Sequence, residues 1–154
     1  MAQEIERKFL VTATTYRELA GGIHYRQGYL NSQKERVVRI RTIDDSAFIT
    51  VKGITKGATR LEYEYEISVS DANEMLNQLC EQPIIEKHRY KVALGNHVWE
   101  IDEFHGENEG LTVAEVELES EDQEYPKPDW IGEEVTGDPR YYNSNLIANP
   151  YKNW

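Results

Sequence analysis

Charged side chains recur at every second position in several short segments of this sequence. Glu4, Glu6 and Lys8 form the first such set, and Arg39 and Arg41 form the second. The later sets are Glu62, Glu64 and Glu66; Lys87 and Arg89; Glu100 and Asp102; and Glu115, Glu117 and Glu119. Because successive side chains of a β-strand point to opposite faces, residues two apart share a face. The spacing therefore predicts strands that carry ionisable groups on one face and mostly apolar groups on the other.

The two kinds of charged group together indicate one class of ligand. Lysine and arginine in this number suit a polyanion with several phosphoryl groups, because guanidinium groups contact phosphate oxygens in a bidentate manner. The basic candidates are Lys8, Arg39, Arg41, Lys52, Lys87 and Arg89, and the acidic candidates are Glu4, Glu6, Glu62, Glu64, Asp102, Glu115 and Glu117. Carboxylates clustered without His or Cys suit the hard cations Mg²⁺ or Mn²⁺. A metal-bound triphosphate, a small-molecule substrate, meets both requirements.

An alternating strand usually has one face in water and one face on the core, so each segment alone is compatible with a solvated surface. The signs of the charges, however, are sorted strand by strand, with Arg39 and Arg41 on one segment and Glu62 and Glu64 on another. Like charges that face each other across a sheet cost stability. Such sorting is expected where a ligand and metal ions supply the missing counter-charges, which favours an enclosed site.

The elements that must position these groups are short strands bounded by Gly, Asn, Asp or Pro. The strands are expected at 3–11, 24–31, 36–43, 46–54, 60–69, 85–94, 97–104 and 111–119. Eight strands in a chain of this length predict a mainly β (α+β) fold, in which an antiparallel sheet closes into a barrel with a few peripheral helices. The interior of such a barrel can hold one small ligand. A single domain over residues 1–154 is expected.

Few segments have helical signals. One helix is expected to begin at the N-cap Ser70, and a short helical turn is expected over 120–123. A terminal helix is expected over 139–148, capped by Asp138. A further short helix near 14–20 is possible, although threonines there disfavour it.

Composition excludes several classes of protein. The chain has 28 acidic and 17 basic residues and a formal net charge of -11, which argues against binding to nucleic acid. The single cysteine, Cys80, cannot form an intrachain disulfide and is expected to be buried. The first residues lack the apolar core of a signal peptide, and no apolar run approaches the roughly 20 residues that a membrane span needs. A cytoplasmic protein without a membrane partner is therefore expected.

The segment Glu4-Ile5-Glu6-Arg7-Lys8 matches the Glu-x-Glu-x-Lys signature of the CYTH superfamily, the triphosphate tunnel metalloenzymes. It is followed in order by Gln27-Gly28-Tyr29-Leu30, Arg39-x-Arg41, Lys52, Glu62-x-Glu64, Lys87-x-Arg89, Asp102 and Glu115-x-Glu117. Residues 132–136 and 140–143 also resemble the C-terminal part of the small bacterial members. The chain is thus similar to this family over nearly its whole length, and the ordered set is specific.

The resemblance implies an eight-stranded tunnel that hydrolyses inorganic tripolyphosphate with Mg²⁺ or Mn²⁺. It implies that the metals are organised by Glu4, Glu6, Asp102, Glu115 and Glu117, and that the phosphates are bound by Lys8, Arg39, Arg41, Lys52, Lys87 and Arg89. Catalytic roles are implied for Lys8 and Tyr29, and water-positioning roles for Glu62 and Glu64. Tyr29 is equally compatible with a core aromatic. Arg140 is expected on a helix surface, with closure over the phosphates as the alternative.

Other functions are compatible with the same scaffold. A thiamine triphosphatase, a nucleoside triphosphatase or an adenylate cyclase would use a similar barrel, and a non-catalytic polyphosphate-binding module would use only its basic half. The full acidic set argues against the module, because a pure polyanion binder would gain affinity by losing carboxylates. No Ser, Cys or Asp is placed as a nucleophile, so direct attack by water is expected. The chain is compatible with a monomer or a homodimer.

Overall fold

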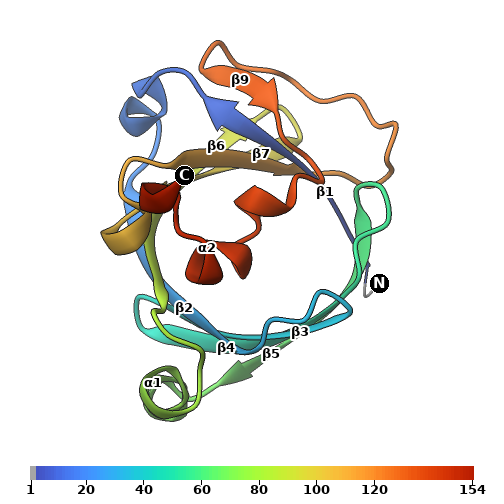
Figure 1. Cartoon of the computed structure of the whole chain (residues 1–154). Helices are drawn as coiled ribbons and strands as arrows, with labels where there is room; N and C mark the ends of the chain where they lie inside the picture. Colours follow the sequence, from blue (N-terminus) through green and yellow to red (C-terminus); the bar gives the residue numbers. More distant parts are fainter. Residues whose placement is uncertain (1–2) are drawn as a thin grey trace.

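Eight antiparallel strands form a closed ring in the computed structural model, which describes residues 3–154 (Figure 1). The strands are β1 (Gln3–Val11), β2 (Gly22–Asn31), β3 (Arg36–Ile43), β4 (Ser46–Gly53), β5 (Thr59–Ile67), β6 (Ile85–Leu94), β7 (His97–Phe104) and β8 (Thr112–Glu117). They pair in the order β5-β4-β3-β2-β6-β7-β8-β1, and β5 returns to β1 to close the barrel. The prediction of an eight-stranded antiparallel barrel is confirmed.

The barrel closes through a short seam between its first and fifth strands. Only Gln3, Glu4 and Ile5 of β1 pair with β5, opposite Leu61, Arg60 and Thr59. Farther along the same edge of β1, a ninth strand, β9 (Ile131–Glu134), pairs with Phe9 and Val11 after a register shift. β9 was not expected from the sequence, because its four residues, with two adjacent glutamates, alternate too little to be recognised as a strand.

Most of the apolar core lies on the outside of the barrel, under the segments that cover it. Phe9 and Trp99 are fully buried, with ring centroids 5.5 Å apart, and Trp130 packs against Trp99 at 5.9 Å. The covering segments here are the 3-10 helix η1 (Thr15–Glu18), which includes the buried Tyr16, and the segment that leads to β9. The outward-facing apolar residues of the strands are therefore core residues, as predicted.

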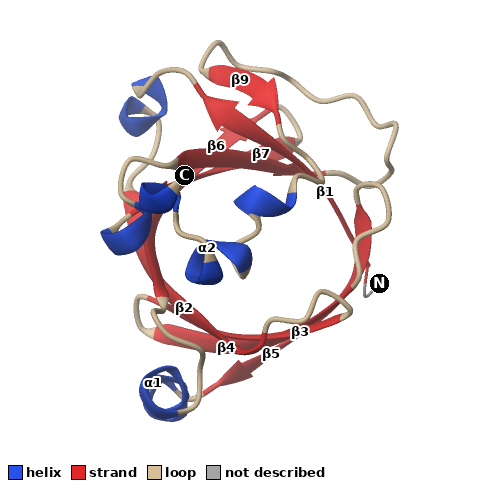
Figure 2. Ribbon diagram, viewed as in Figure 1, coloured by secondary structure: helices blue, strands red, loops and turns tan. Residues whose placement is uncertain are grey.

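A second core cluster lies under α1 (Val69–Gln78), which packs against β2, β3 and β4 (Figure 2). Its N-cap is Ser68, whose Oγ accepts a hydrogen bond from the Asp71 N–H at 3.0 Å. The predicted cap, Ser70, was therefore two residues too late. An added Cβ at Gly28 would meet the Cys80 Cβ at 3.0 Å, so glycine there allows α1 to lie close to β2. Cys80 is buried, as predicted.

The C-terminal segment closes one end of the barrel. The predicted helix over 139–148 is split into the 3-10 helix η3 (Pro139–Tyr141) and α2 (Asn145–Ala148), and both lie inside the ring of strands in Figure 2. Asp138 caps η3 through the Arg140 N–H, as expected. Leu146 and Ile147 of α2 are buried in one cluster with the strand residues Val37, Ile85, Phe104 and Val113. This end of the lumen is therefore apolar and filled.

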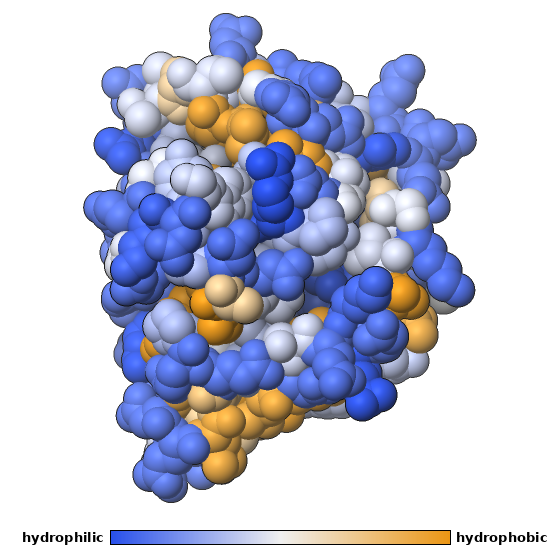
Figure 3. Space-filling model, in the orientation of Figure 1, coloured by the Kyte–Doolittle hydropathy of each residue, from blue (hydrophilic) through white to orange (hydrophobic). Residues whose placement is uncertain are grey.

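The remaining helical elements are short. Two more 3-10 helices are η2 (Gly106–Asn108) and η4 (Tyr151–Asn153). The predicted helical turn over 120–123 is a turn without a helix, in which Gln123 Oε1 accepts from the Glu119 N–H. Within residues 3–154, no helix has the length and apolarity that crossing a bilayer requires. Figure 3 shows a largely hydrophilic face around the C-terminal segment, with apolar atoms gathered at its lower edge.

Candidate active site

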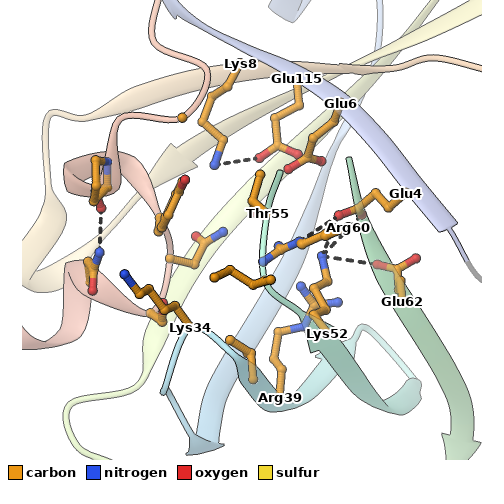
Figure 4. Close-up of a pocket in the computed structure, with 18 of the residues that line it drawn as sticks. Glu4, Glu6, Lys8, Lys34, Arg39, Lys52, Thr55, Arg60, Glu62 and Glu115 are labelled. Carbon is orange, nitrogen blue, oxygen red and sulfur yellow. Dashed lines mark hydrogen bonds and ion pairs between the residues drawn. The ribbon is translucent and has the colours of Figure 1, made fainter. Parts of the chain in front are cut away.

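A cavity of about 630 Å³ occupies the barrel interior. That volume is typical of a small-molecule site. The predicted residues that line it are Glu4, Glu6, Lys8, Tyr29, Arg39, Arg41, Lys52, Glu62, Glu64, Arg89, Glu115 and Glu117. Figure 4 labels seven of them, namely Glu4, Glu6, Lys8, Arg39, Lys52, Glu62 and Glu115. The structure therefore brings together residues from seven strands in one cavity, and of the predicted set only Lys87 and Asp102 do not line it.

The strands have their charged faces inward. Arg39 and Lys52 are each only 6% exposed, whereas the apolar Val51 and Tyr63 on the opposite face are 36% and 45% exposed. Charged residues are seldom buried unless they are paired or bind a ligand. The two-residue rhythm of the sequence thus points into the cavity rather than into water.

Carboxylates crowd one side of the cavity. Pairing of β1 with β8 places Glu6 opposite Glu117 and Lys8 opposite Glu115. Burial raises the pKa of Glu6 well above its usual value, and the charges of Glu115 and Glu4 raise it further. Burial and the neighbouring Glu4 also raise the pKa of Glu117. Burial alone would raise the pKa of Glu115 as well, but the charges of Lys8 and Arg89 outweigh it and lower that pKa. The nearby bases therefore balance only part of this group of acids, and Glu6 and Glu117 are the carboxylates left without enough positive charge.

This acidic side fits a hard divalent cation through the chemistry of its donors. Mg²⁺ or Mn²⁺ reduces the repulsion between neighbouring carboxylate oxygens. The charge of such a cation also lowers the pKa of the carboxylates beside it. As the side chains of residues 3–154 lie, no three His, Cys, Asp or Glu groups are already gathered around a single point. The carboxylates would therefore have to move closer together to share a cation.

Two bases hold the first carboxylate of β1 in place. Lys52 Nζ lies 3.2 Å from Glu4 Oε2 and 3.1 Å from Glu62 Oε2, and Arg60 Nε lies 3.1 Å from Glu4 Oε1. Burial alone would raise the pKa of Glu4, but Lys52 and Arg60 outweigh it and lower the pKa to about 2. Glu4 is thus an ionised, fully oriented carboxylate.

Guanidinium groups crowd the neighbouring part of the cavity. Arg39 and Arg41 both lie 3.6 Å from Glu64 Oε2, and Thr50 Oγ1 donates to the same oxygen at 2.8 Å. Burial lowers the pKa of Arg41 to about 10, and the nearby Arg39 and Arg89 contribute. The Nε atoms of Arg39 and Arg41 are buried and have no hydrogen-bond acceptor among the described residues. One glutamate does not balance these cations, so the arrangement favours an anionic ligand.

Lys8 is held by the C-terminal segment. Its Nζ donates to the Tyr141 carbonyl at 3.3 Å and lies 3.5 Å from Glu115 Oε1. Its backbone N–H donates to Thr136 Oγ1 at 2.9 Å, and its carbonyl accepts from the Val135 N–H at 2.8 Å. Burial alone would lower the pKa of Lys8, but the charges of Glu115 and Glu6 raise it above its usual value. The ammonium group therefore remains charged in the cavity.

Lys87 and Asp102 lie behind the cavity wall rather than on it. Asp102 accepts from Lys87 Nζ at 2.7 Å and from Arg89 Nε and Nη2 at 2.7 and 2.9 Å. Both carboxylate oxygens are occupied, and Lys87 is fully buried. Burial lowers the pKa of Lys87 to about 7, although Asp102 opposes the shift. The geometry places Asp102 as a partner of two bases and leaves neither Asp102 nor Lys87 in contact with the cavity.

Tyr29, Arg140 and several other charged residues occupy different parts of the barrel. Tyr29 is 4% exposed, lines the cavity and also belongs to the apolar cluster that fills the barrel end. It is therefore a core aromatic that reaches the site, and its catalytic role stays a prediction. Arg140 is on the surface, paired with Asp138, as expected for a helix-surface arginine. Glu100 lines the cavity, whereas Glu66 does not. His88 lies outside the cavity and hydrogen-bonds His105 at 2.7 Å.

Sequence reasoning missed several cavity residues. Arg60 shares strand parity with Glu62 and Glu64, so the same two-residue rhythm would have identified it. Lys34, Thr55, Tyr142 and Asn143 also line the cavity, but they come from loops and from the C-terminal segment, which have no such rhythm.

Comparison with known proteins gives consistent matches over the whole chain. The CYTH domain family matches residues 2–146. An inorganic triphosphatase of Acetivibrio thermocellus is 57% identical over 154 residues, which cover 100% of this chain and 99% of that protein. An inorganic triphosphatase of Nitrosomonas europaea is 41% identical over 150 residues, covering 95% and 97%.

Solved structures show the same barrel. A crystal structure of the inorganic triphosphatase NE1496 has a TM-score of 0.64 and 37% identity, and the match covers 93% of this chain and 96% of that one. A putative adenylate cyclase of Bacillus halodurans has a TM-score of 0.61 at 18% identity, covering 79% and 84%. The second likeness shows a shared fold alone.

Proposed function

The chain belongs to the CYTH domain family, and we propose that it is an inorganic triphosphatase that cleaves tripolyphosphate to pyrophosphate and phosphate in a single domain over residues 1–154. The observation that carries this proposal is the inward-facing charge of a closed barrel. Carboxylates on one side and guanidinium groups on the other suit a substrate that is itself a chain of anions bound to a cation.

The divalent cation, Mg²⁺ or Mn²⁺, would be held by Glu4, Glu6, Glu115 and Glu117. When bound, it supplies Lewis-acid chemistry and neutralises charge on phosphoryl oxygens. Asp102 is left out of this set, because it is 2% exposed, does not line the cavity and is bound to Lys87 and Arg89, whereas Glu4 lines the cavity. We assign Asp102 and Lys87 instead to positioning Arg89.

The phosphoryl groups would be bound by Arg39, Arg41, Lys52, Arg89 and Lys8. Phosphoryl transfer leaves little covalent work to the protein, so positioning and charge stabilisation account for most of the catalysis. Glu64 holds Arg39 and Arg41 in place, while Glu62 is half-buried beside Lys52 and is the better placed of the two to orient the attacking water. Tyr29 lies in the same wall and would act beside Lys8.

Substrate preference is tested by measuring phosphate release from tripolyphosphate, ATP and thiamine triphosphate with Mg²⁺ and with Mn²⁺. The proposal expects the highest kcat/KM with tripolyphosphate and no activity in excess chelator. A higher value with thiamine triphosphate or ATP would indicate one of the other triphosphatases, and cyclic nucleotide formation would indicate a cyclase. Tight binding of tripolyphosphate without phosphate release would indicate a non-catalytic module.

Ligand binding is also expected to stabilise the fold. Like charges face one another in the cavity, and a ligand that binds only the folded state stabilises it by mass action. Tripolyphosphate with Mg²⁺ at about 100 times its Kd should raise Tm by roughly 5 to 10 °C. Differential scanning fluorimetry measures the shift, with sodium sulfate at matched ionic strength as the control. An unchanged Tm at saturating ligand would contradict an internal charged site.

We infer that the enzyme acts in the cytoplasm on a small-molecule substrate without nucleic acid. The single cysteine and the acidic net charge of -11 support this inference. Light scattering of the purified protein would distinguish a monomer from a homodimer.

A further inference from the structure

One cation of the cavity stands apart from the carboxylates. Lys34, in the β2–β3 loop, lines the cavity, and in Figure 4 its ammonium group lies across the cavity from Glu4 and Glu62. Among the described residues, Lys34 forms no ion pair, whereas Lys8, Lys52 and Arg89 each have an acidic partner. Lys34 is exposed, so it lies where the cavity opens to water, and a lysine that lines a site there without a counter-charge is a candidate ligand for an anion.

The backbone that carries Lys34 is held in one conformation by the hairpin itself. Asn31 Nδ2 donates to the Arg36 carbonyl at 2.8 Å, and the Arg36 N–H donates to the Gln33 carbonyl at 3.0 Å. The loop is only four residues long and joins two paired strands. These bonds order the short loop that carries Lys34 beside the cavity.

The surroundings of Lys34 differ from the catalytic side. This part of the cavity is lined by hydroxyl and amide side chains, namely Ser32, Tyr142, Asn143, Ser144 and Asn145. The Oδ1 of Asn143 is buried without a hydrogen-bond partner among the described residues, and rotation of that amide by half a turn presents its NH₂ group instead. Tyr142 also lies beside Lys8, whose Nζ is 5.6 Å from the ring centroid, so this wall adjoins the catalytic side. Hydroxyl and amide groups with the unpaired Lys34 suit a single terminal phosphoryl group rather than a metal.

The barrel ends just beyond this region. Val37 and Tyr29 line the cavity and also belong to the apolar cluster in which Leu146 and Ile147 fill the barrel end. Leu146 is fully buried, so that cluster fills the barrel end beside Lys34. A free phosphoryl end fits here, while a phosphate esterified to a nucleoside carries one ionised oxygen fewer and must also place its sugar.

We propose that Lys34 and the segment opposite it, Tyr142–Asn145, form the subsite for the phosphoryl group that is not attacked, and that Lys34 makes the enzyme prefer inorganic tripolyphosphate to nucleoside triphosphates. This inference rests on the proposed triphosphatase activity and adds a specificity-determining residue to it. The physical basis is the extra negative charge at the free end of tripolyphosphate. An unpaired ammonium group binds that phosphoryl group more strongly than it binds an esterified one.

The test compares Lys34→Gln, Lys34→Arg and the wild type in phosphate release from tripolyphosphate and from ATP. The Lys34→Gln variant should lower kcat/KM for tripolyphosphate about tenfold through KM, the size expected for one charged hydrogen bond, and kcat should stay within about twofold. Its kcat/KM for ATP should change by less than about twofold, so that the preference itself falls. Lys34→Arg should keep most of the preference.

Lys56→Gln is the matched control. Lys56 is exposed on the β4–β5 loop at the same end of the barrel and does not line the cavity, so its replacement removes the same charge without the contact. If Lys34→Gln lowered kcat/KM equally for tripolyphosphate and ATP, or if Lys56→Gln lowered it by the same factor, the effect of Lys34 would be a general electrostatic one. Either result would overturn the inference. Active wild type with an unchanged Lys34→Gln overturns the inference alone. A wild type that releases no phosphate from any triphosphate overturns the proposed function and the inference with it.

Discussion

Replacing Glu4 by Gln is expected to lower kcat for tripolyphosphate hydrolysis by at least about 100-fold, the scale of losing one preorganised charge at a phosphoryl-transfer site. The substitution keeps the shape of the side chain but removes a full negative charge from the acidic side of the cavity. Lys52 and Arg60 hold Glu4 ionised, with a pKa of about 2. The wild-type side chain therefore carries its full negative charge at neutral pH, and glutamine carries none. Steady-state kinetics in saturating Mg²⁺ measures the effect.

The fold should survive this change, because Lys52 keeps Glu62 as a partner at 3.1 Å. Circular dichroism and a melting curve of the variant check this point. Glu66→Gln is the control, since Glu66 has the same strand parity as Glu62 and Glu64 but lies outside the cavity. Near-normal turnover in Glu4→Gln, with the metal requirement intact, would show that Glu4 is not part of the catalytic machinery.

Replacing Asp102 by Ala is expected to lower the free energy of unfolding by about 3–5 kcal/mol, because it leaves two buried cations without their shared partner. Asp102 contacts Lys87 and Arg89 through three hydrogen bonds of 2.7 to 2.9 Å. The side chain of Lys87 is fully buried, so it cannot recover the lost interaction from water. Urea denaturation of the wild type and the variant without any ligand gives the difference.

Asp138→Ala is the control that shows how much of the loss in the free energy of unfolding comes from burial of the ion pair rather than from the pairing itself. Asp138 also pairs with an arginine, Arg140, but that pair is exposed, and a much smaller loss is expected. If Asp102 were instead a metal ligand, Asp102→Ala would leave the stability of the metal-free protein nearly unchanged and weaken the apparent affinity for Mg²⁺. Those two results together would show that Asp102 is a metal ligand, as the family resemblance implied.

The two-residue rhythm of the sequence was sufficient to predict the barrel strands. The bounds of β3, β6 and β7 agree with the prediction at both ends, and β1 runs from 3 to 11 as expected. Strand parity also assigned the cavity face correctly, because alternation along a strand is a local geometric property. Sorting of like charges on that face indicated a bound counter-charge, and Lys52 at 6% exposure shows that the face is enclosed.

Non-local contacts were beyond this kind of reasoning. Pairing of β9 with β1 joins residues more than a hundred positions apart, and no short pattern encodes it. The C-terminal helix was expected to be continuous, but the chain breaks between η3 and α2 so that Leu146 and Ile147 can pack into the barrel end. Tertiary packing overrides local helical preference in such a case.

The roles of charged residues depended on depth as well as on face. Lys87, Arg89 and Asp102 lie on the strand face that points into the barrel, yet of these three only Arg89 lines the cavity. Lys87 and Asp102 are buried behind the wall, where Asp102 accepts hydrogen bonds from Lys87 and Arg89. Strand parity specifies the side of the sheet on which a group lies, because that follows from backbone geometry. How far along the lumen it lies, and what it meets there, follows from the stagger of the strands and from the segment that fills the barrel end, and both arise only when distant parts of the chain come together.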